Sequence, residues 1–411
     1  MVSLSGRIGL FALMAWTAAL PFAQIQKTRF TSIFIFLLLG AFLIRFAFQR
    51  SFRIIPKDHQ KLCWAFLLFT LFPLLDFFRW QSPLKGEEAV FLRLPFLVLP
   101  FLVVQFEKDW PFFWRKLAIS VLLFSFLLCH FLIGLQGVEK VYAAARTDFY
   151  PDIRFYLHRP YTGLIAGIFL WLAFGIFRNN LWRMAALLVF GGLQFWVLSK
   201  FSLLAFSLCL VVYLYFSLPA GGNARRFVLI MSLLTAGFLA FRISRSQAFK
   251  ELVSTGGIDF NTVSKTYSNS INNRSLLWQA GMRLLARDHN WVFGLGTGNF
   301  QDLLDAEVGK YNDYLPGQHL NPHNIFLYYG LQYGLAGFAL LIFFLLAWTG
   351  EARQSGKRHL VYMAIFMLLC CQTEIFLDRE LGIQLFLWVA VVLFRDRQAT
   401  VTDDEPPFFQ S

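Results

Sequence analysis

The chain leaves a long polar block and enters apolar sequence through the stretch Gly317-Gln-His-Leu-Asn-Pro-His323-Asn324-Ile-Phe-Leu-Tyr-Tyr-Gly330. The block starts near Arg242 and is the only long polar stretch in an otherwise hydrophobic sequence. If the apolar segment that follows crosses a membrane, His323 is expected where water meets lipid. A site at that boundary suits an enzyme whose substrate has a lipid tail in the bilayer and a polar head outside it.

The composition predicts an all-α polytopic membrane protein. Of the 411 residues, 57% are hydrophobic and only 15% are charged, whereas soluble domains are typically about 25% charged. The apolar segments are too long for the strands of a membrane barrel, so helices are expected to span the bilayer. All five cysteines lie in apolar segments. Neither a disulfide framework, a zinc site nor a cofactor is therefore indicated.

About twelve transmembrane helices are expected, at roughly 20 residues each. Their approximate ranges are 8–23, 30–48, 62–78, 89–105, 116–136, 161–177, 182–199, 201–218, 226–241, 323–348, 359–377 and 380–395. The chain would divide into an N-terminal transmembrane bundle of about nine helices at 1–241, a large loop with short helices at 242–322, C-terminal transmembrane helices at 323–395, and a tail at 396–411. The loop is expected to contain a helix near 274–287.

The net charge of +13 is compatible with nucleic-acid binding or with the basic cytoplasmic loops of a membrane protein. The basic residues favour the second interpretation because they cluster in short loops between helices: Arg50, Arg53, Lys57 and Lys61; Lys108, Arg115 and Lys116; Arg225 and Arg226; Arg353, Lys357 and Arg358. These loops and both termini are expected to be cytoplasmic. The polar segments 137–160 and 242–322 would then lie outside, and the expected partner is the lipid bilayer and not a nucleic acid.

His323 is a candidate general base. Asn321 is a favourable N-cap and Pro322 fits the first helical position, so His323 is expected in the first turn of a helix. The positive end of the helix dipole would lower the pKa of the imidazole and keep it able to accept a proton. The alternative is that His323 is an amphipathic anchor at the membrane interface.

Several basic side chains are candidates for binding an anion. Arg274 is expected at the start of the outer helix, where free backbone N–H groups and a guanidinium suit a phosphate; otherwise it is a solvated surface arginine. Lys200 either marks a tight outer turn or is a membrane cation with a partner or a role. His158 and Arg159, just before the helix at 161–177, would steer an anionic substrate or belong to an ordinary loop.

Two further groups of residues are expected on the outer side of the membrane. Acidic and basic residues between the last two helices are expected to pair with one another or with arginines of the site: Glu374, Asp378, Arg379 and Glu380. The run Gly294, Gly296 and Gly298 does not follow a strand or open a helix of a βαβ unit, so tight turning is favoured over dinucleotide binding. No metal-ligand spacing is present.

In this order, the motifs resemble the O-antigen ligase and O-antigen polymerase superfamily of polytopic membrane glycosyltransferases. The resemblance covers about residues 150–395 and is carried by Leu157-His158-Arg159-Pro160-Tyr161, Asn273-Arg274-Ser-Leu-Leu-Trp278, Phe293-Gly-Leu-Gly-Thr-Gly-Asn-Phe300, Pro322-His323-Asn324-Ile-Phe-Leu327 and Tyr333-Gly334-Leu335-Ala336-Gly337. One departure is Ser199-Lys200, where the family often has Ser-Arg. Lysine keeps the charge but loses the bidentate phosphate geometry.

The resemblance implies metal-independent, inverting transfer of a glycan from undecaprenyl diphosphate at the periplasmic face of a bacterial inner membrane. His323 would be the base, Arg274 with Lys200 and Arg159 would hold the diphosphate, and Asn324, His158 and Glu374 would support them. The acceptor would be lipid A-core for a ligase, or another lipid-linked repeat for a polymerase. A ligase acting on a protein hydroxyl and a transporter of lipid-linked sugars are further alternatives; a transporter would call for polar residues at the membrane midplane and repeated halves.

Overall fold

The computed structural model describes residues 4–22, 30–49, 60–76, 83–106, 110–111, 113–135, 159–177, 179–196, 200–217, 222–223, 225–227, 230, 270–311 and 320–394. Within these ranges the backbone forms only helices and turns. The main elements are α1 (Leu4–Ala19), η1 (Leu20–Phe22), α2 (Phe30–Gln49), α3 (Gln60–Leu75), α4 (Pro83–Phe106), α5 (Trp114–Leu135), α7 (Arg159–Ile176), α8 (Asn180–Ala186), η5 (Leu187–Gly191), α9 (Gly192–Trp196), α10 (Lys200–Ser217), α13 (Ser270–Ala286), α14 (Asn290–Phe293), α15 (Phe300–Gly309), α16 (Ile325–Tyr333), α17 (Leu335–Gln354), α18 (Arg358–Cys370), η7 (Phe376–Asp378) and α19 (Glu380–Val392).

The predicted all-α class is confirmed for these residues, and most of the predicted helices are found within a few residues of their expected positions. Four helical segments are long and apolar enough to cross a membrane: Leu4–Phe22, Ala89–Phe106, Trp114–Leu135 and Leu335–Gln354. Six further helices contain shorter apolar segments of 10–17 described residues. These apolar helices are those of a membrane protein. The number of about twelve crossings stays a prediction. The predicted helix at 226–241 and the tail at 396–411 fall almost wholly outside the described residues.

The core is centred on α19, in which every residue from Leu381 to Val392 is buried. Two hydrogen bonds between α19 and the N-terminal helix α1 hold this core across the sequence. The indole N–H of Trp16 donates to Oε1 of Gln384 at 3.0 Å, and that of Trp388 donates to the hydroxyl of Thr17 at 3.3 Å. Each bond satisfies a buried polar group where water is excluded.

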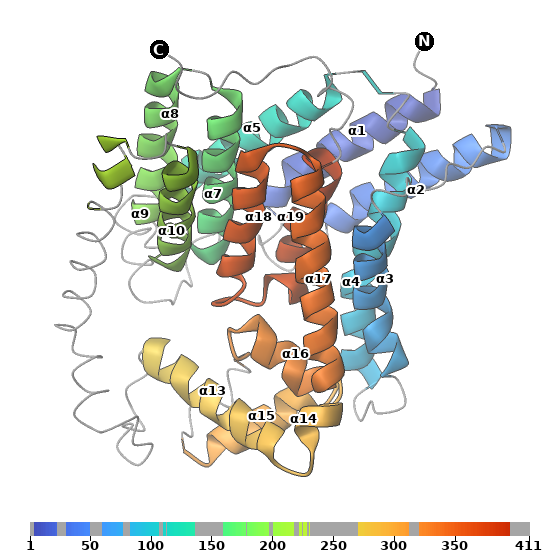
Figure 1. Ribbon diagram of the computed structural model, residues 1–411. Coiled ribbons are helices and arrows are strands. Elements are labelled where there is room, and N and C mark those ends of the chain that lie inside the picture. Colours follow the sequence, from blue (N-terminus) through green and yellow to red (C-terminus); the bar gives the residue numbers. More distant parts are fainter. Residues whose placement is uncertain are drawn as a thin grey trace.

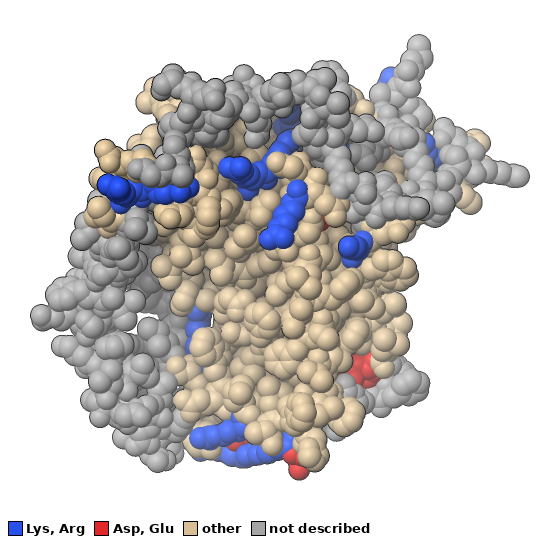
Figure 2. Space-filling view, in the orientation of Figure 1, with Lys and Arg blue, Asp and Glu red and all other residues tan. Residues whose placement is uncertain are grey.

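The described part of the polar block forms a cap at one end of the helices. Figure 1 shows α13, α14 and α15 together at the lower end of the view, beyond α16 and the lower end of α17. In Figure 2, Lys and Arg side chains gather towards the upper part of the visible face and at its lower end, with few between them. This distribution is typical of a protein with a lipid-facing belt between two polar surfaces.

The predicted continuous helix at 323–348 is wrong, because the chain breaks at Gly334 into α16 and α17. Gly334 has φ +59°, which a side chain would disfavour. A Cβ atom there would also lie 2.4 Å from the carbonyl oxygen of Val292. Gly294 faces it from the glycine turn with φ +70°, and a Cβ there would lie 2.3 Å from the carbonyl oxygen of Gln332. The two glycines therefore let the turn and the helix break meet backbone to backbone.

The glycine run at 294–298 thus forms a tight turn, as the sequence predicted, and this turn joins the polar cap to α16. Backbone N–H groups of Leu295 and Gly296 donate to the carbonyl oxygens of Leu331 and Gln332 at 2.6 and 2.9 Å. The last turn of α16 is thereby fixed to the segment between α14 and α15.

Candidate functional site

The segment 321–324 forms a short strap between the polar cap and α16. The side chain of Asn324 accepts a hydrogen bond from the backbone N–H of Leu327 at 3.0 Å, so Asn324 is the N-cap of α16. The predicted N-cap, Asn321, instead accepts from the N–H of His323 at 2.8 Å in a local turn. The prediction that His323 lies in the first helical turn is therefore wrong: it precedes the cap, in a left-handed conformation with φ +47°.

Contacts on both sides hold the strap in place. From α13, the indole N–H of Trp278 donates to the carbonyl oxygen of Pro322 at 2.6 Å. From the end of α18, the carbonyl oxygen of Cys371 accepts from the N–H of Ile325 at 3.3 Å. A non-glycine residue with positive φ has a conformational cost of roughly 1–3 kcal/mol, and such residues occur where surrounding contacts determine the backbone. The backbone of His323 is determined in this way.

Arg274 was expected at the start of its helix, but α13 begins at Ser270, so Arg274 lies in the second turn. Its side chain is 22% exposed, and the guanidinium lies over the ring of Phe201, 5.5 Å from the ring centroid. Nη2 lies 3.4 Å from Oε1 of Glu374. The guanidinium is thus partly withdrawn from water but remains accessible to a ligand.

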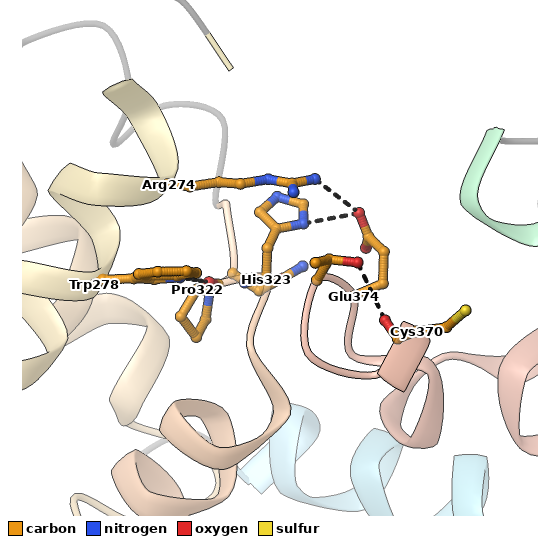
Figure 3. Close-up of polar contacts among 8 residues, drawn as sticks. Arg274, Trp278, Pro322, His323, Cys370 and Glu374 are labelled. Carbon is orange, nitrogen blue, oxygen red and sulfur yellow. Dashed lines mark hydrogen bonds and ion pairs between the residues drawn. The ribbon is translucent and has the colours of Figure 1, made fainter. Parts of the chain in front are cut away.

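Glu374 brings His323 and Arg274 together (Figure 3). Its Oε1 lies 3.1 Å from Nδ1 of His323, the same oxygen that faces Arg274. The sequence left open whether Glu374 would pair with its charged neighbours or with an arginine of the candidate site, and the structure shows the pair with Arg274. An ionised carboxylate can only accept hydrogen bonds, so Nδ1 of His323 is assigned as the donor. Nε2 then carries the lone pair and is free to accept a proton.

Ring contacts place the starts of α7 and α10 close to this group. Tyr161, in the first turn of α7, packs against Phe376 with ring centroids 4.9 Å apart, and Phe376 is two residues after Glu374. Phe201, which contacts Arg274, is the second residue of α10. The backbones of Arg159 and Lys200 therefore begin helices next to the site. Their side chains and all of His158 are outside the described residues, so their proposed roles stay predictions.

Sequence reasoning missed two features of the site. Trp278 belonged to a recognised motif, but no local pattern shows that its N–H would hold the strap. Asp378 was grouped with Glu374, yet its partners come from distant helices: Arg93 on α4, and Tyr328 on α16. Arg93 is 285 residues and Tyr328 is 50 residues before Asp378 in the chain. Only the fold brings them together.

The family model described as O-antigen ligase matches residues 160–342. The match includes α7, α10, the glycine joint, and both Arg274 and His323, whereas Glu374 lies beyond its end. No match was found among curated proteins.

Proposed function

We propose that this protein is a glycosyltransferase that moves a glycan from undecaprenyl diphosphate to lipid A-core, in line with the match of residues 160–342 to the O-antigen ligase family model. The observation that carries the proposal is the convergence of His323, Glu374 and Arg274 at one oxygen atom of Glu374. A base oriented by a carboxylate beside a guanidinium provides what displacement of a diphosphate requires. These residues face one another from three separate segments of the chain.

In the proposed reaction, an acceptor hydroxyl attacks the anomeric carbon of the donor sugar while the bond from that carbon to the diphosphate oxygen breaks. Nε2 of His323 takes the hydroxyl proton, and Glu374 stabilises the imidazolium that results. The diphosphate leaves with the bonding electrons and stays bound at Arg274. A single displacement of this kind inverts the anomeric carbon.

The leaving diphosphate carries more negative charge than Arg274 alone can neutralise, and the fold offers further positive charge. Three helices of 17–18 residues, α7, α10 and α13, begin beside the group. The N-terminal end of a helix carries about half a positive elementary charge and presents free N–H groups to an anion. We assign Arg159 and Lys200, which begin two of these helices, to the same task. A metal ion is not part of this proposal.

The proposed orientation puts the polar cap, and so the active site, in the periplasm of a bacterial inner membrane. It is supported by the basic residues expected in the cytoplasmic loops and by the position of α13–α15 beyond one end of the helices (Figure 1). The lipid tail of the donor would then remain in the bilayer while its diphosphate reaches Arg274 from the side.

The test is a transfer assay with purified protein in liposomes, supplied with an undecaprenyl-diphosphate-linked glycan and lipid A-core. His323→Ala should lower turnover by about 10²–10⁴-fold, the usual contribution of a general base. Arg274→Ala should nearly abolish transfer, while Arg274→Lys should restore part of it because the charge returns without the planar fork. Near-normal turnover by folded His323→Ala protein would refute the assignment of the base.

Matched controls come from the same polar cap. His289 is exposed and has φ +61°, a conformation that asparagine tolerates, so His289→Asn should keep full activity. Arg283 lies on the helix that carries Arg274, and its guanidinium contacts the ring of Tyr311. Arg283→Ala should therefore leave transfer unchanged. Loss of activity in both controls would show that the assay reports the integrity of the cap and not the chemistry.

The two acceptor classes are separated by omitting lipid A-core. A ligase forms no product from the donor alone, whereas a polymerase joins two donors into a longer lipid-linked glycan. EDTA should leave the rate unchanged in either case. A complete loss in EDTA that a divalent ion restores would overturn the metal-independent mechanism.

A further inference from the structure

Arg93 is a fully buried cation in a helix that is long and apolar enough to cross a membrane. Its exposed fraction is 0%, and it lies on α4 within the segment Ala89–Phe106. A charged side chain inside a membrane protein is costly unless it is paired, and such residues commonly mark functional positions. The family match does not include α4, so nothing in the resemblance assigns Arg93 a role.

Two guanidinium nitrogens of Arg93 have identified partners. Nη1 donates to the carbonyl oxygen of Ala89, one turn earlier in α4, at 2.8 Å. Nη2 forms an ion pair with Oδ1 of Asp378. The second carboxylate oxygen of Asp378, Oδ2, accepts a hydrogen bond from the hydroxyl of Tyr328. Arg93, Asp378 and Tyr328 are hereafter the buried triad.

The triad connects the two segments that carry the reacting pair. Asp378 ends the short helix η7 and is four residues after Glu374. Tyr328 is the fourth residue of α16, whose cap Asn324 directly follows His323. Asp378 thus joins the turn that carries Glu374 to the helix that follows the strap, and Arg93 fixes Asp378 from the N-terminal bundle.

A purely stabilising role is the competing explanation. Replacement of a buried ion pair by well-packed apolar residues is often neutral or stabilising, so the pair alone is weak evidence for a contribution to stability. The position of Asp378 between the two site segments gives the triad a different consequence. A change in the geometry of the triad would change the distance between Glu374 and His323. Their hydrogen bond is already 3.1 Å long and would weaken if this distance increased.

We propose that Arg93 is a positioning residue of the transfer site, and that the buried triad sets the distance between Glu374 and His323. This inference rests on the proposed function. Arg93 does not touch the substrate in this scheme; it acts on the base through Asp378 and Tyr328. Its loss should consequently affect the chemical step more than donor binding.

The first test measures transfer kinetics for Arg93→Met, Arg93→Lys, Asp378→Asn and the double variant Arg93→Met/Asp378→Asn. Partners that orient a metal-binding histidine are typically worth about 10–100-fold, and we expect kcat of Arg93→Met to fall by a factor of the same order. KM for the lipid-linked donor should stay within about twofold, and Arg93→Lys should recover part of kcat. The double variant should lose no more than the single ones, since both remove one interaction.

The second test does not depend on transfer activity. Nitrogen NMR of histidine-labelled protein reports the tautomer of His323, with its signal assigned through His323→Gln. The wild type should show a fixed Nδ1–H form, and Arg93→Met should show exchange between the two tautomers. This measurement remains informative if the wild type transfers no glycan at all, so failure of the proposed function and failure of the inference are distinguishable.

Tyr328→Phe and Arg45→Met complete the design. Tyr328→Phe removes one hydroxyl, so it should lower kcat by less than Arg93→Met and cause the same change in the His323 signal. This variant keeps the proposal testable if Arg93→Met does not fold. Arg45 is another buried arginine of the N-terminal helices, with its guanidinium over the ring of Phe106, and Arg45→Met should leave both readouts unchanged. Unchanged kcat and an unchanged His323 signal in Tyr328→Phe and in folded Arg93→Met would overturn the proposal.

Discussion

Glu374→Gln is the most discriminating single substitution, because it keeps the shape of the side chain and removes only its charge. In the structure one oxygen of Glu374 faces both Nδ1 of His323 at 3.1 Å and Nη2 of Arg274 at 3.4 Å. The side chain is only about 10% exposed, so water does little to replace the lost charge. The amide oxygen of glutamine can still accept from Nδ1, so the bond is weakened and not deleted.

The size of the effect follows from the two kinds of hydrogen bond. A bond to a charged group contributes roughly 1.5–3 kcal/mol, and a neutral one roughly 0.5–1.5 kcal/mol. The difference is on the order of 1–1.5 kcal/mol, which is about a tenfold loss of kcat. Glu374→Ala removes the whole bond and should cost about 10–100-fold. Both variants release Arg274 from its carboxylate, so KM for the donor should stay the same or fall.

The assay is steady-state transfer with the donor varied at saturating lipid A-core. The reasoning would be refuted if Glu374→Gln kept full kcat, since the carboxylate would then have no part in stabilising the imidazolium. A rise in KM with unchanged kcat would also contradict it, because that pattern would assign Glu374 to donor binding. Equal losses in the glutamine and alanine variants would mean that only the charge matters and the hydrogen bond does not.

Three further predictions concern the joint, the cap and the topology. Gly334→Ala should lower the melting temperature and abolish transfer, because the new Cβ would lie 2.4–2.6 Å from backbone atoms. Gly356 also has a positive φ, +72°, but has open space around it, so Gly356→Ala should lower the free energy of unfolding by only about 1–2 kcal/mol. Equal melting temperatures for the two variants would show that the contact between Gly334 and Gly294 does not stabilise the fold. Burial raises the pKa of Glu307, but hydrogen bonds from Lys310 and Arg287 outweigh it and leave the pKa below its usual 4.5. Its stabilising contribution is therefore present above pH 4.5 and is lost as the pH falls through the folded-state value. Glu307→Gln should remove this part of the acid sensitivity in thermal unfolding; an unaltered pH profile would contradict it. Finally, a membrane-impermeant thiol reagent should label a cysteine introduced at Tyr311 but not one at Arg225 in intact cells, and the reverse pattern would invert the proposed topology.

The positions of most helices could be predicted from sequence because long apolar runs have few alternatives in a membrane protein. The break at Gly334 could not. It lies inside an apolar run, and an isolated glycine in such a run is compatible with a continuous helix. Its left-handed conformation is chosen by the backbone contact with Gly294, which is a tertiary interaction.

The candidate site residues could be selected from sequence, but their geometry could not. His323 and Arg274 were found through their motifs, and the structure brings both to Glu374. The cap of α16 was misassigned because Asn321 and Asn324 are equally good N-cap residues. The local turn between Asn321 and His323 satisfies the first of them and leaves Asn324 to begin the helix. Arg93 carried no local signal, since an arginine in an apolar run does not reveal a partner 285 residues away.

The site therefore depends on parts of the chain that the family match does not include. Arg274 and His323 lie inside residues 160–342, but Glu374, which contacts both, lies after this range. The triad that we propose to position Glu374 reaches back to Arg93 on α4. A fragment limited to residues 160–342 would have His323 without Glu374. It would also have the strap without Cys371, whose carbonyl oxygen accepts from the N–H of Ile325. Buried donors and charges without partners are destabilising. If His323 and Glu374 act as proposed, transfer is expected from the assembled chain and not from the matched segment, because Glu374 and its partner Asp378 both lie outside that segment.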